Sequence, residues 1–212
     1  MSPSPEAPPT PSLRQQAVLG AVLALMVEEG DQLTMDAVAR RASCSKETLY
    51  KWFGDRDGLL TATVRWQAAQ VRADRYEGQA LDAASLRENL ESFAATWLSV
   101  VASRTSVALN RIAIGHATAR KSNLGGIVLE NGRFAIGARL KPVLEAGRAA
   151  GLLAFEDGEE AFRTFFGLVG RDIQIRLLLG DALSLDEDAI AREAARAVAQ
   201  FLALHGRASS NP

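Results

Sequence analysis

The chain has 212 residues, 48% of them hydrophobic, and a formal net charge of −1. This length suits one domain of ordinary size or a small domain joined to a larger one, and the apolar content is sufficient for a core. Because the charge is nearly balanced, the protein does not coat nucleic acid through global basicity, and any DNA contact must come from a local patch. The low aromatic content, 6%, favours helices.

Cysteine, histidine and hydropathy patterns exclude several kinds of site. Cys44 is the only cysteine, so no intrachain disulfide can form, and a reducing cytoplasm is the expected compartment. His116 and His205 lie far apart in the sequence without a cysteine near them, so we expect no metal site. No apolar run is long enough to span a bilayer, and we expect no membrane partner. Residues 17–27 have the composition of a signal-peptide core, but two glutamates follow where a cleavage site should be.

The N-terminal quarter contains a proline-rich tail and then helices with clear capping residues. Residues 1–11 hold five of the seven prolines and cannot pack, which predicts a disordered tail. Helices are expected at 13–29 after the N-cap Ser12, at 35–42 after Thr34, at 46–53 after Ser45, and from 56 to about 76.

Beyond Gly78 every strong segment also has the helical period. The expected helices span 85–101, 106–119, 124–150 with a bend at Pro142, 157–179, and 184–205 before Gly206. The last of them opens with SLDE, a capping box that begins at Ser184. Since no Asn-Gly hairpin and no sustained period-two alternation occurs, we predict an all-α fold.

Residues 35–53 have the spacing of a helix-turn-helix, with a short helix, a turn of about three residues and a second short helix. Leu49 and Phe53, four residues apart, face the core together, which turns the polar side chains between them outward. A helix that enters the major groove must stand clear of its core, so it needs few apolar anchors and many outward polar groups. By itself this pattern is a weak indication, because any corner between two helices looks similar.

The residues within the pattern are more specific. Residues 33–60, LTMDAVARRASCSKETLYKWFGDRDGLL, match the DNA-binding motif of the TetR family of transcriptional regulators almost throughout, and residues 133–181 resemble the C-terminal domains of its AefR-like branch. The resemblance implies an N-terminal three-helix DNA-binding domain and a larger helical domain for ligand binding and dimerisation. The expected parts are a tail at 1–11, the DNA-binding domain at 12–60, the regulatory domain at 61–206 and a tail at 207–212.

The resemblance assigns DNA contacts to polar residues of the two short helices and the start of the next helix. These residues are Thr34, Ser45, Lys46, Glu47, Thr48, Tyr50, Lys51 and Arg56. Thr34, Tyr50 and Arg56 would bind phosphate, and positions 45–48 would touch base edges or the flanking backbone. Lys46 suits a guanine, and Glu47 can accept a hydrogen bond from cytosine. The alternative is that these side chains form an ordinary solvated face.

Three positions depart from the family pattern. Ser43 stands where the family usually has a glycine, which would cost on the order of 1 kcal/mol if the backbone there is left-handed. Cys44 replaces an aliphatic residue and is expected to be a buried spacer. No Lys or Arg precedes Arg14, so a basic arm for the minor groove is not supported.

The resemblance also implies that the last two long helices form a four-helix interface with a second copy. The 157–179 segment is apolar over a broad arc, and Gly167 and Gly170 would let another helix approach closely. The predicted interface residues are Phe162, Phe166, Val169, Ile173, Leu177, Ile190, Ala194, Ala197, Val198 and Phe201. The alternative is that 157–179 is simply the central buried helix of its domain.

A ligand pocket is expected among the middle helices. The candidate lining residues are Trp97, Asn110, Arg111, His116 and Phe134. Phe93 and Phe134 are more readily explained as core residues. Because no Asp or Glu occurs from Ser92 to Leu129, a pocket in this region favours small apolar effectors that are neutral or anionic.

The function that these patterns predict is a homodimeric, sequence-specific DNA-binding regulator, a repressor that a small molecule releases from its operator. A DNA-binding regulator or architectural protein without an inducer remains an alternative. A helical enzyme is disfavoured, because no nucleophile–base pair, metal cluster or phosphate-binding glycine loop is recognisable, and no cofactor is expected. A protein-interaction bundle leaves the polar face at 46–51 unexplained.

Overall fold

The computed structural model describes residues 10–30, 32–71, 81–119, 123–183 and 185–207. Within these ranges every named element is helical, which confirms the all-α prediction. The only β-type pairing in them is an isolated bridge between Leu153 and Gly206. None of the helices in these ranges is long and apolar enough to cross a membrane. Most of the predicted proline-rich tail lies outside the described residues.

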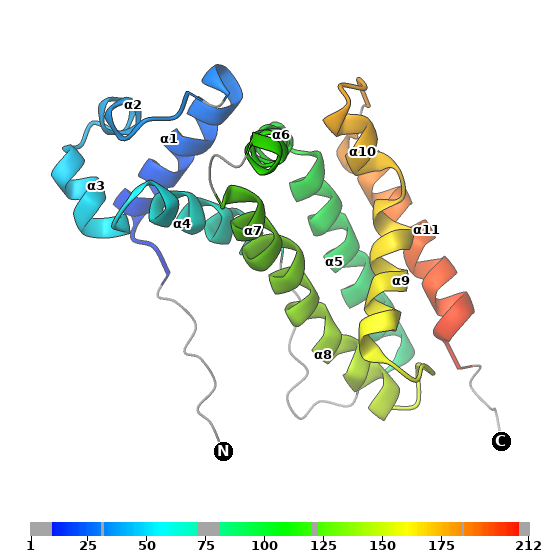
Figure 1. The fold of residues 1–212 in the computed structure, drawn as a ribbon. Helices are drawn as coiled ribbons and strands as arrows, with labels where there is room; N and C mark the ends of the chain where they lie inside the picture. The colour runs from blue at the N-terminus through cyan, green and yellow to red at the C-terminus, as the bar shows by residue number, and fades with distance from the viewer. Residues whose placement is uncertain (1–9, 31, 72–80, 120–122, 184, 208–212) are drawn as a thin grey trace, which may run out of the picture.

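The helices follow one another in the order shown in Figure 1. They are α1 Leu13–Glu29, α2 Met35–Arg41, α3 Lys46–Phe53, α4 Arg56–Ala68, α5 Ala83–Ala102, α6 Arg104–Ala119, α7 Leu124–Val128, the π-helix η1 Leu129–Phe134, α8 Ala135–Ala149, α9 Gly158–Gly170, α10 Ile173–Leu178 and α11 Glu187–His205. The predicted N-caps are confirmed: Ser12, Thr34 and Ser45 each accept a hydrogen bond from the backbone N–H three residues later. These bonds satisfy donors that a helix start leaves unpaired.

Helices α1 to α4 enclose a small core of their own. Leu19, Leu49 and Leu60 are fully buried in it, and each comes from a different helix. Leu109 of α6 and Leu124 of α7 belong to the same core, so the second domain packs directly against the first. In Figure 1, α6 and α7 lie between α1 and α4 and the rest of the larger domain.

The larger core lies among α5, α8, α9 and α11, which run side by side in Figure 1. Phe165 of α9 is at its centre, with ring centroids 6.3 Å from Phe93 of α5 and 5.3 Å from Phe201 of α11. All three rings are almost completely buried, which confirms the expectation that Phe93 is a core residue. This core holds the helices whose inner faces surround the cavity described below.

The helix after the DNA-binding segment is shorter than expected. We predicted that it continues to about residue 76, but α4 ends at Ala68. Arg139 of α8 donates hydrogen bonds to the carbonyl oxygens of Ala68 and Val71, which satisfies two acceptors just where the helix stops. Residues 72–76 lie outside the described part of the chain.

The prediction of a single helix at 157–179 is wrong, because this segment forms two helices. The chain turns at Arg171, whose φ is 42°, so α9 ends at Gly170 and the short α10 starts at Ile173. A left-handed residue cannot continue a right-handed helix. The apolar positions keep their spacing across the break, which is why the pattern did not reveal it.

Two further helix predictions need correction. In the segment expected as one helix from 124 to 150, the irregularity is the π-helix η1, and α8 continues through Pro142. The N-cap of α11 is Asp186, whose carboxylate accepts from the N–H of Ala189 at 2.7 Å, and not the predicted Ser184. The expected stop at Gly206 is confirmed as the C-cap.

Candidate nucleic-acid interface and internal cavity

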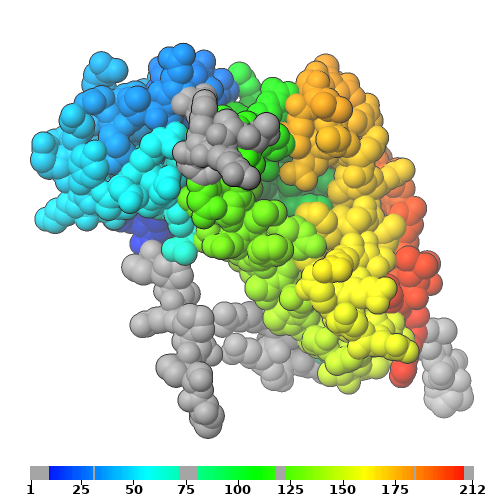
Figure 2. Space-filling view, viewed as in Figure 1, coloured from blue at the N-terminus to red at the C-terminus, as the bar shows by residue number. Residues whose placement is uncertain are grey.

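Helices α2 and α3 form a helix-turn-helix (Figure 1), and the atoms of this segment lie at one end of the molecule in the space-filling view of Figure 2. Leu49 anchors α3 with no exposed surface, and the partly buried Phe53 packs against the same core. Lys46, in the first turn of α3, forms an ion pair of 3.0 Å with Asp36 in the first turn of α2. This contact raises the pKa of Lys46 and links the starts of the two helices.

The outward side of α3 carries polar groups of both signs. Tyr50 is 51% exposed, and Lys51 beside it is also exposed. Hydrogen bonds from its own backbone N–H and from the Ser45 hydroxyl lower the pKa of Glu47, so this carboxylate stays ionised at the N-terminus of α3. The face therefore presents donors and one acceptor around a single apolar anchor, as a groove-reading helix requires.

Other predicted contact residues are already engaged within the protein. The Nε of the half-buried Arg56 donates to the carbonyl oxygen of Leu33 at 3.4 Å. The hydroxyl oxygens of Ser45 and Thr48 lie 3.1 Å apart, and that of Thr34 accepts from the N–H of Ala37 at 3.1 Å. Each keeps hydrogen-bonding capacity for phosphate, but Arg56 must reach it with its terminal nitrogens.

Trp52 packs and does not point to solvent. Its half-buried ring lies edge-on to Phe53, with centroids 6.2 Å apart. The guanidinium carbon of Arg14, at the start of α1, lies 6.0 Å from the Trp52 ring. The position of Arg14 beside α3 could not be predicted from the sequence, because this contact depends on how α1 crosses the helix-turn-helix. Arg14 thus adds a positive charge next to the polar face.

Ser43 adopts the left-handed conformation that the family motif suggested, with a φ of 49°. Because a β-carbon is unfavourable at this φ, we expect Ser43→Gly to raise the free energy of unfolding by about 1 kcal/mol, measured by urea unfolding. Ser99→Gly, at an exposed position inside α5, is the matched control and should lower stability by a few tenths of a kcal/mol. A loss of stability in Ser43→Gly would contradict the strain argument.

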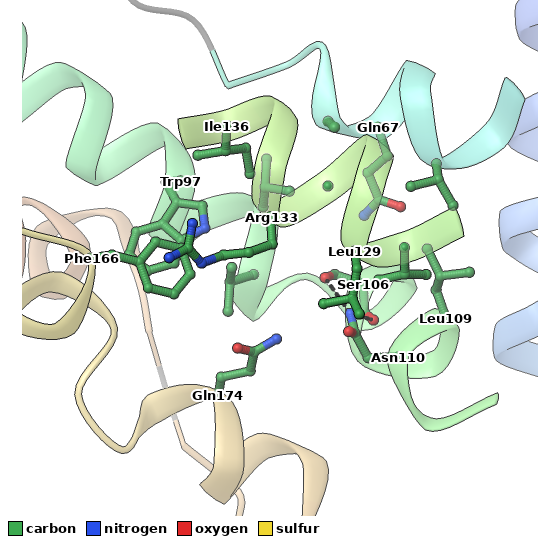
Figure 3. A pocket seen from close by; sticks show the side chains of 16 residues that line it. Gln67, Trp97, Ser106, Leu109, Asn110, Leu129, Arg133, Ile136, Phe166 and Gln174 are labelled. Atoms are coloured by element: carbon green, nitrogen blue, oxygen red, sulfur yellow. Dashed lines mark hydrogen bonds between the residues drawn. The ribbon is translucent and has the colours of Figure 1, made fainter. Parts of the chain in front are cut away.

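A cavity of about 270 Å³ lies between the two domains, at the junction of α4, α5, α6, η1 and the α9–α10 region. Its polar lining residues are Gln67, Ser106, Asn110, Arg133 and Gln174, and its largest apolar ones are Trp97 and Phe166 (Figure 3). Among the described residues that line it there is no Asp or Glu. The volume is close to the lower end of small-molecule sites, roughly 300 Å³.

Two of the five predicted pocket residues, Trp97 and Asn110, line this cavity. The other three need correction. Arg111 instead donates to the carbonyl oxygens of Leu178 at 3.0 Å and Leu177 at 2.8 Å, at the end of α10. His116 is buried away from the lining, and Phe134 is 59% exposed, so the expectation that it is core is also wrong.

Most of the predicted dimer residues are part of the protomer's own core. Seven have almost no exposed surface: Phe162, Val169, Ile173, Ala194, Ala197, Val198 and Phe201. Phe166, Leu177 and Ile190 are partly buried and pack against the same core. The alternative, a central buried helix, describes α9 correctly, because seven of the ten side chains have almost no surface left for a partner. Any interface formed by α9 and α11 must use their opposite sides.

Comparisons with known proteins agree with this arrangement. Residues 18–63 match the family described as bacterial regulatory proteins, tetR family, and residues 88–207 match the C-terminal domain of AefR-like transcriptional repressors. No curated protein matches the chain.

Many solved structures are similar to this chain, and two of them match it over nearly its whole length with at least 30% identity. A TetR transcriptional regulator from Agrobacterium tumefaciens has 46% sequence identity and a TM-score of 0.79, and the match covers 92% of this chain and 95% of that chain. The flavonoid-responsive regulator FrrA has 30% identity and a TM-score of 0.66, with 92% and 98% covered. Both domains and their relative arrangement are therefore shared with known regulators.

Proposed function

Because the chain belongs to the TetR family of transcriptional regulators, which are not enzymes, we propose that it is a homodimeric repressor that a small-molecule effector releases from its operator. The observation that carries the proposal is the position of α4. The N-terminal end of α4 packs against α3, and Val64, Gln67 and Ala68 further along it line the cavity. One helix thus touches both the DNA-reading face and the effector site.

This arrangement supports a direct coupling between the two sites. The Nε of Arg65 on α4 donates to the Oδ1 of Asn131 on η1 at 2.6 Å, and η1 also lines the cavity. An effector that fits one position of α4 and η1 better than another shifts the population towards that position. Since α3 moves with α4, the spacing of the two recognition helices in a dimer changes, and operator affinity falls.

The dimer that we propose uses the outer side of α11 and α9. Ala191, Ala195, Ala199 and Ala203 follow one another at intervals of four residues along α11, and all are exposed or half-exposed. Gly167 of α9 is exposed, with open space around it. Small side chains allow helices of two copies to pack closely as a four-helix bundle, and twofold symmetry supplies a second DNA half-site.

The effector is a small, largely apolar molecule that is neutral or anionic. No carboxylate among the described residues lines the cavity, so nothing there would balance a cation. The similarity to FrrA, which is flavonoid-responsive, supports control by a small organic molecule. We place the protein in the cytoplasm with its operator.

The test is a selection of bound duplexes from a random DNA pool. We expect a palindrome whose half-sites are about one helical turn apart, or a multiple of it, because each protomer inserts one α3. Failure of folded, effector-free protein to enrich any sequence would overturn the proposed function. Stabilisation against heat by members of a panel of small organic acids then separates an effector-controlled repressor from a DNA-binding protein without an inducer.

Tyr50→Phe and Lys51→Ala should each lower operator affinity several-fold without changing stability. Lys51→Ala should also reduce the slope of log affinity against log salt by about 1, because one phosphate contact is lost. Arg87→Ala, on an exposed position of α5, is the matched control and should leave both quantities unchanged. Equal salt slopes for the wild type and Lys51→Ala would remove Lys51 from the interface.

A further inference from the structure

Arg133 carries a charge into the cavity that no described residue neutralises. Its guanidinium carbon lies 4.4 Å from the ring centroid of Phe162 and 4.2 Å from that of Phe166, and it has no ion pair or hydrogen bond with a described residue. Glu159 is near enough to influence it, but that carboxylate already pairs with Lys141 at 2.9 Å and Arg163 at 3.3 Å. Burial lowers the pKa of Arg133, yet a guanidinium remains charged at neutral pH.

The contacts of Arg133 leave its donors free. The guanidinium lies over the Phe162 and Phe166 rings, as Figure 3 shows for Phe166, and a contact with a ring uses none of the N–H groups that lie in the guanidinium plane as a conventional hydrogen-bond donor. A carboxylate binds such a group edge-on through two parallel hydrogen bonds. The aromatic neighbours therefore hold Arg133 in place for an anion.

Gln67 of α4 also lines the cavity, and hydrogen bonds fix the orientation of its side-chain amide. Its Nε2 donates to the hydroxyl oxygens of Ser103 at 3.3 Å and Thr105 at 3.1 Å. The Ser103 hydroxyl itself donates to the carbonyl oxygen of Val100 at 2.7 Å, so Ser103 acts as an acceptor and the Gln67 amide is oriented with its nitrogen towards it.

The Oε1 of Gln67 is consequently an acceptor without a partner. The residue is only 6% exposed, it lines the cavity, and Oε1 forms no hydrogen bond with any residue that the structure describes. A buried acceptor that stays unpaired destabilises the protein, so a ligand that donates a hydrogen bond there gains affinity. Figure 3 shows Gln67 and Arg133 entering from different helices, with apolar side chains around them.

We propose that the effector is an organic carboxylate with a flat apolar body and a hydroxyl group, its carboxylate on Arg133 and its hydroxyl donating to Oε1 of Gln67. This inference rests on the proposed function and narrows its effector from neutral or anionic molecules to hydroxylated acids. Asn110 contributes less, because its Nδ2 is already bonded to the carbonyl oxygen of Ser106 at 2.8 Å.

The experiment measures binding of three related molecules to the full-length protein by titration calorimetry. 4-Hydroxycinnamate has both groups at opposite ends of a flat body, its methyl ester lacks the charge, and cinnamate lacks the hydroxyl. We expect 4-hydroxycinnamate to bind at least about tenfold more tightly than either of the others. Equal affinity for all three, or no binding of 4-hydroxycinnamate, overturns the assignment.

Variants of Arg133 and Gln67 test whether these two residues bind the carboxylate and the hydroxyl group. Arg133→Gln should weaken 4-hydroxycinnamate binding by about tenfold or more and leave the ester nearly unchanged, because only the acid pairs with the guanidinium. Gln67→Leu should remove the preference for 4-hydroxycinnamate over cinnamate. Arg87→Gln, an exposed arginine on α5, is the matched control and should change neither affinity.

The same preparations are tested on the selected operator without any acid. Wild-type operator affinity together with no binding of the three molecules rejects the carboxylate proposal while leaving the DNA-binding function intact. Absence of operator binding, by contrast, counts against the proposed function itself. The two failures are therefore distinguishable.

Discussion

Gly58→Ala is expected to abolish specific operator binding and to lower the free energy of unfolding by about 2–3 kcal/mol. Gly58 lies in the first turn of α4, where its N–H donates to the Oδ1 of the N-cap Asp55 at 2.7 Å. A β-carbon at this position would overlap the carbonyl oxygen of Phe53 and lie 3.2 Å from its carbonyl carbon. Both atoms belong to the backbone at the end of α3, so no side-chain rotation relieves the overlap, and α3 itself must move.

Gly20→Ala is the matched control within the same domain. Gly20 is in the middle of α1, and an added β-carbon meets no atom within 4 Å. Since alanine favours helix over glycine, this variant should raise stability by about 0.5–1 kcal/mol and bind the operator normally. Urea unfolding and operator titration are measured on both variants. Wild-type stability and affinity in Gly58→Ala would show that the contact between α3 and α4 does not fix the recognition helix.

The features that could be predicted from sequence are those that neighbouring residues determine. Ser12, Thr34 and Ser45 cap helices through bonds that span three residues, so the side chain and the backbone it serves are visible together in the sequence. The left-handed Ser43 was anticipated from the resemblance to the family, whose motif usually has a glycine at this position. The predicted bounds of the two short helices accordingly differ from the observed bounds by at most one residue.

Trp97 and Asn110 were predicted correctly, but most residues of the cavity could not be predicted, because four or more helices bring them together. Phe134 was expected to face inward, but the neighbouring Arg133 does so. A single position rotates a side chain by about 100° around an α-helix, and the wider turn of η1 changes that rotation again. Gln67 was not predicted as a cavity residue, because the feature that distinguishes it is the unpaired Oε1, which only the folded structure reveals.

Most of the predicted dimer residues lie in the protomer's own core, and the sequence pattern did not reveal this for a different physical reason. Apolar periodicity indicates which side of a helix is buried, but not whether the protomer or a partner buries it. Phe162, Val198 and Phe201 have the spacing of an interface and are enclosed within one chain. The exposed side of α11 carries four alanines at intervals of four residues among charged side chains, and such small side chains give a weak signal in the sequence.

Arg139→Met is expected to weaken binding to the full palindrome by about tenfold while leaving affinity for a single half-site unchanged. Arg139 of α8 donates to the carbonyl oxygens of Ala68 and, at 3.0 Å, of Val71, and so fastens the end of α4 to the larger domain. Burial lowers the pKa of this half-buried guanidinium, but it stays protonated and bonds the negative end of the helix dipole. Methionine keeps the apolar stem and leaves both carbonyl groups without this partner, which should cost about 2–3 kcal/mol of stability.

Arg163→Met, whose guanidinium is exposed and pairs with Glu159 at 3.3 Å, is the control and should change neither affinity. Comparing Arg139→Met with Gly58→Ala distinguishes a loosened α4 from a displaced α3. A displaced α3 reads no half-site, so Gly58→Ala loses both kinds of binding. A loosened α4 still carries a normal α3 but no longer holds two of them at a fixed separation, so only the palindrome is affected. Equal losses on half-site and palindrome in Arg139→Met would mean that α4 does not transmit position between the domains.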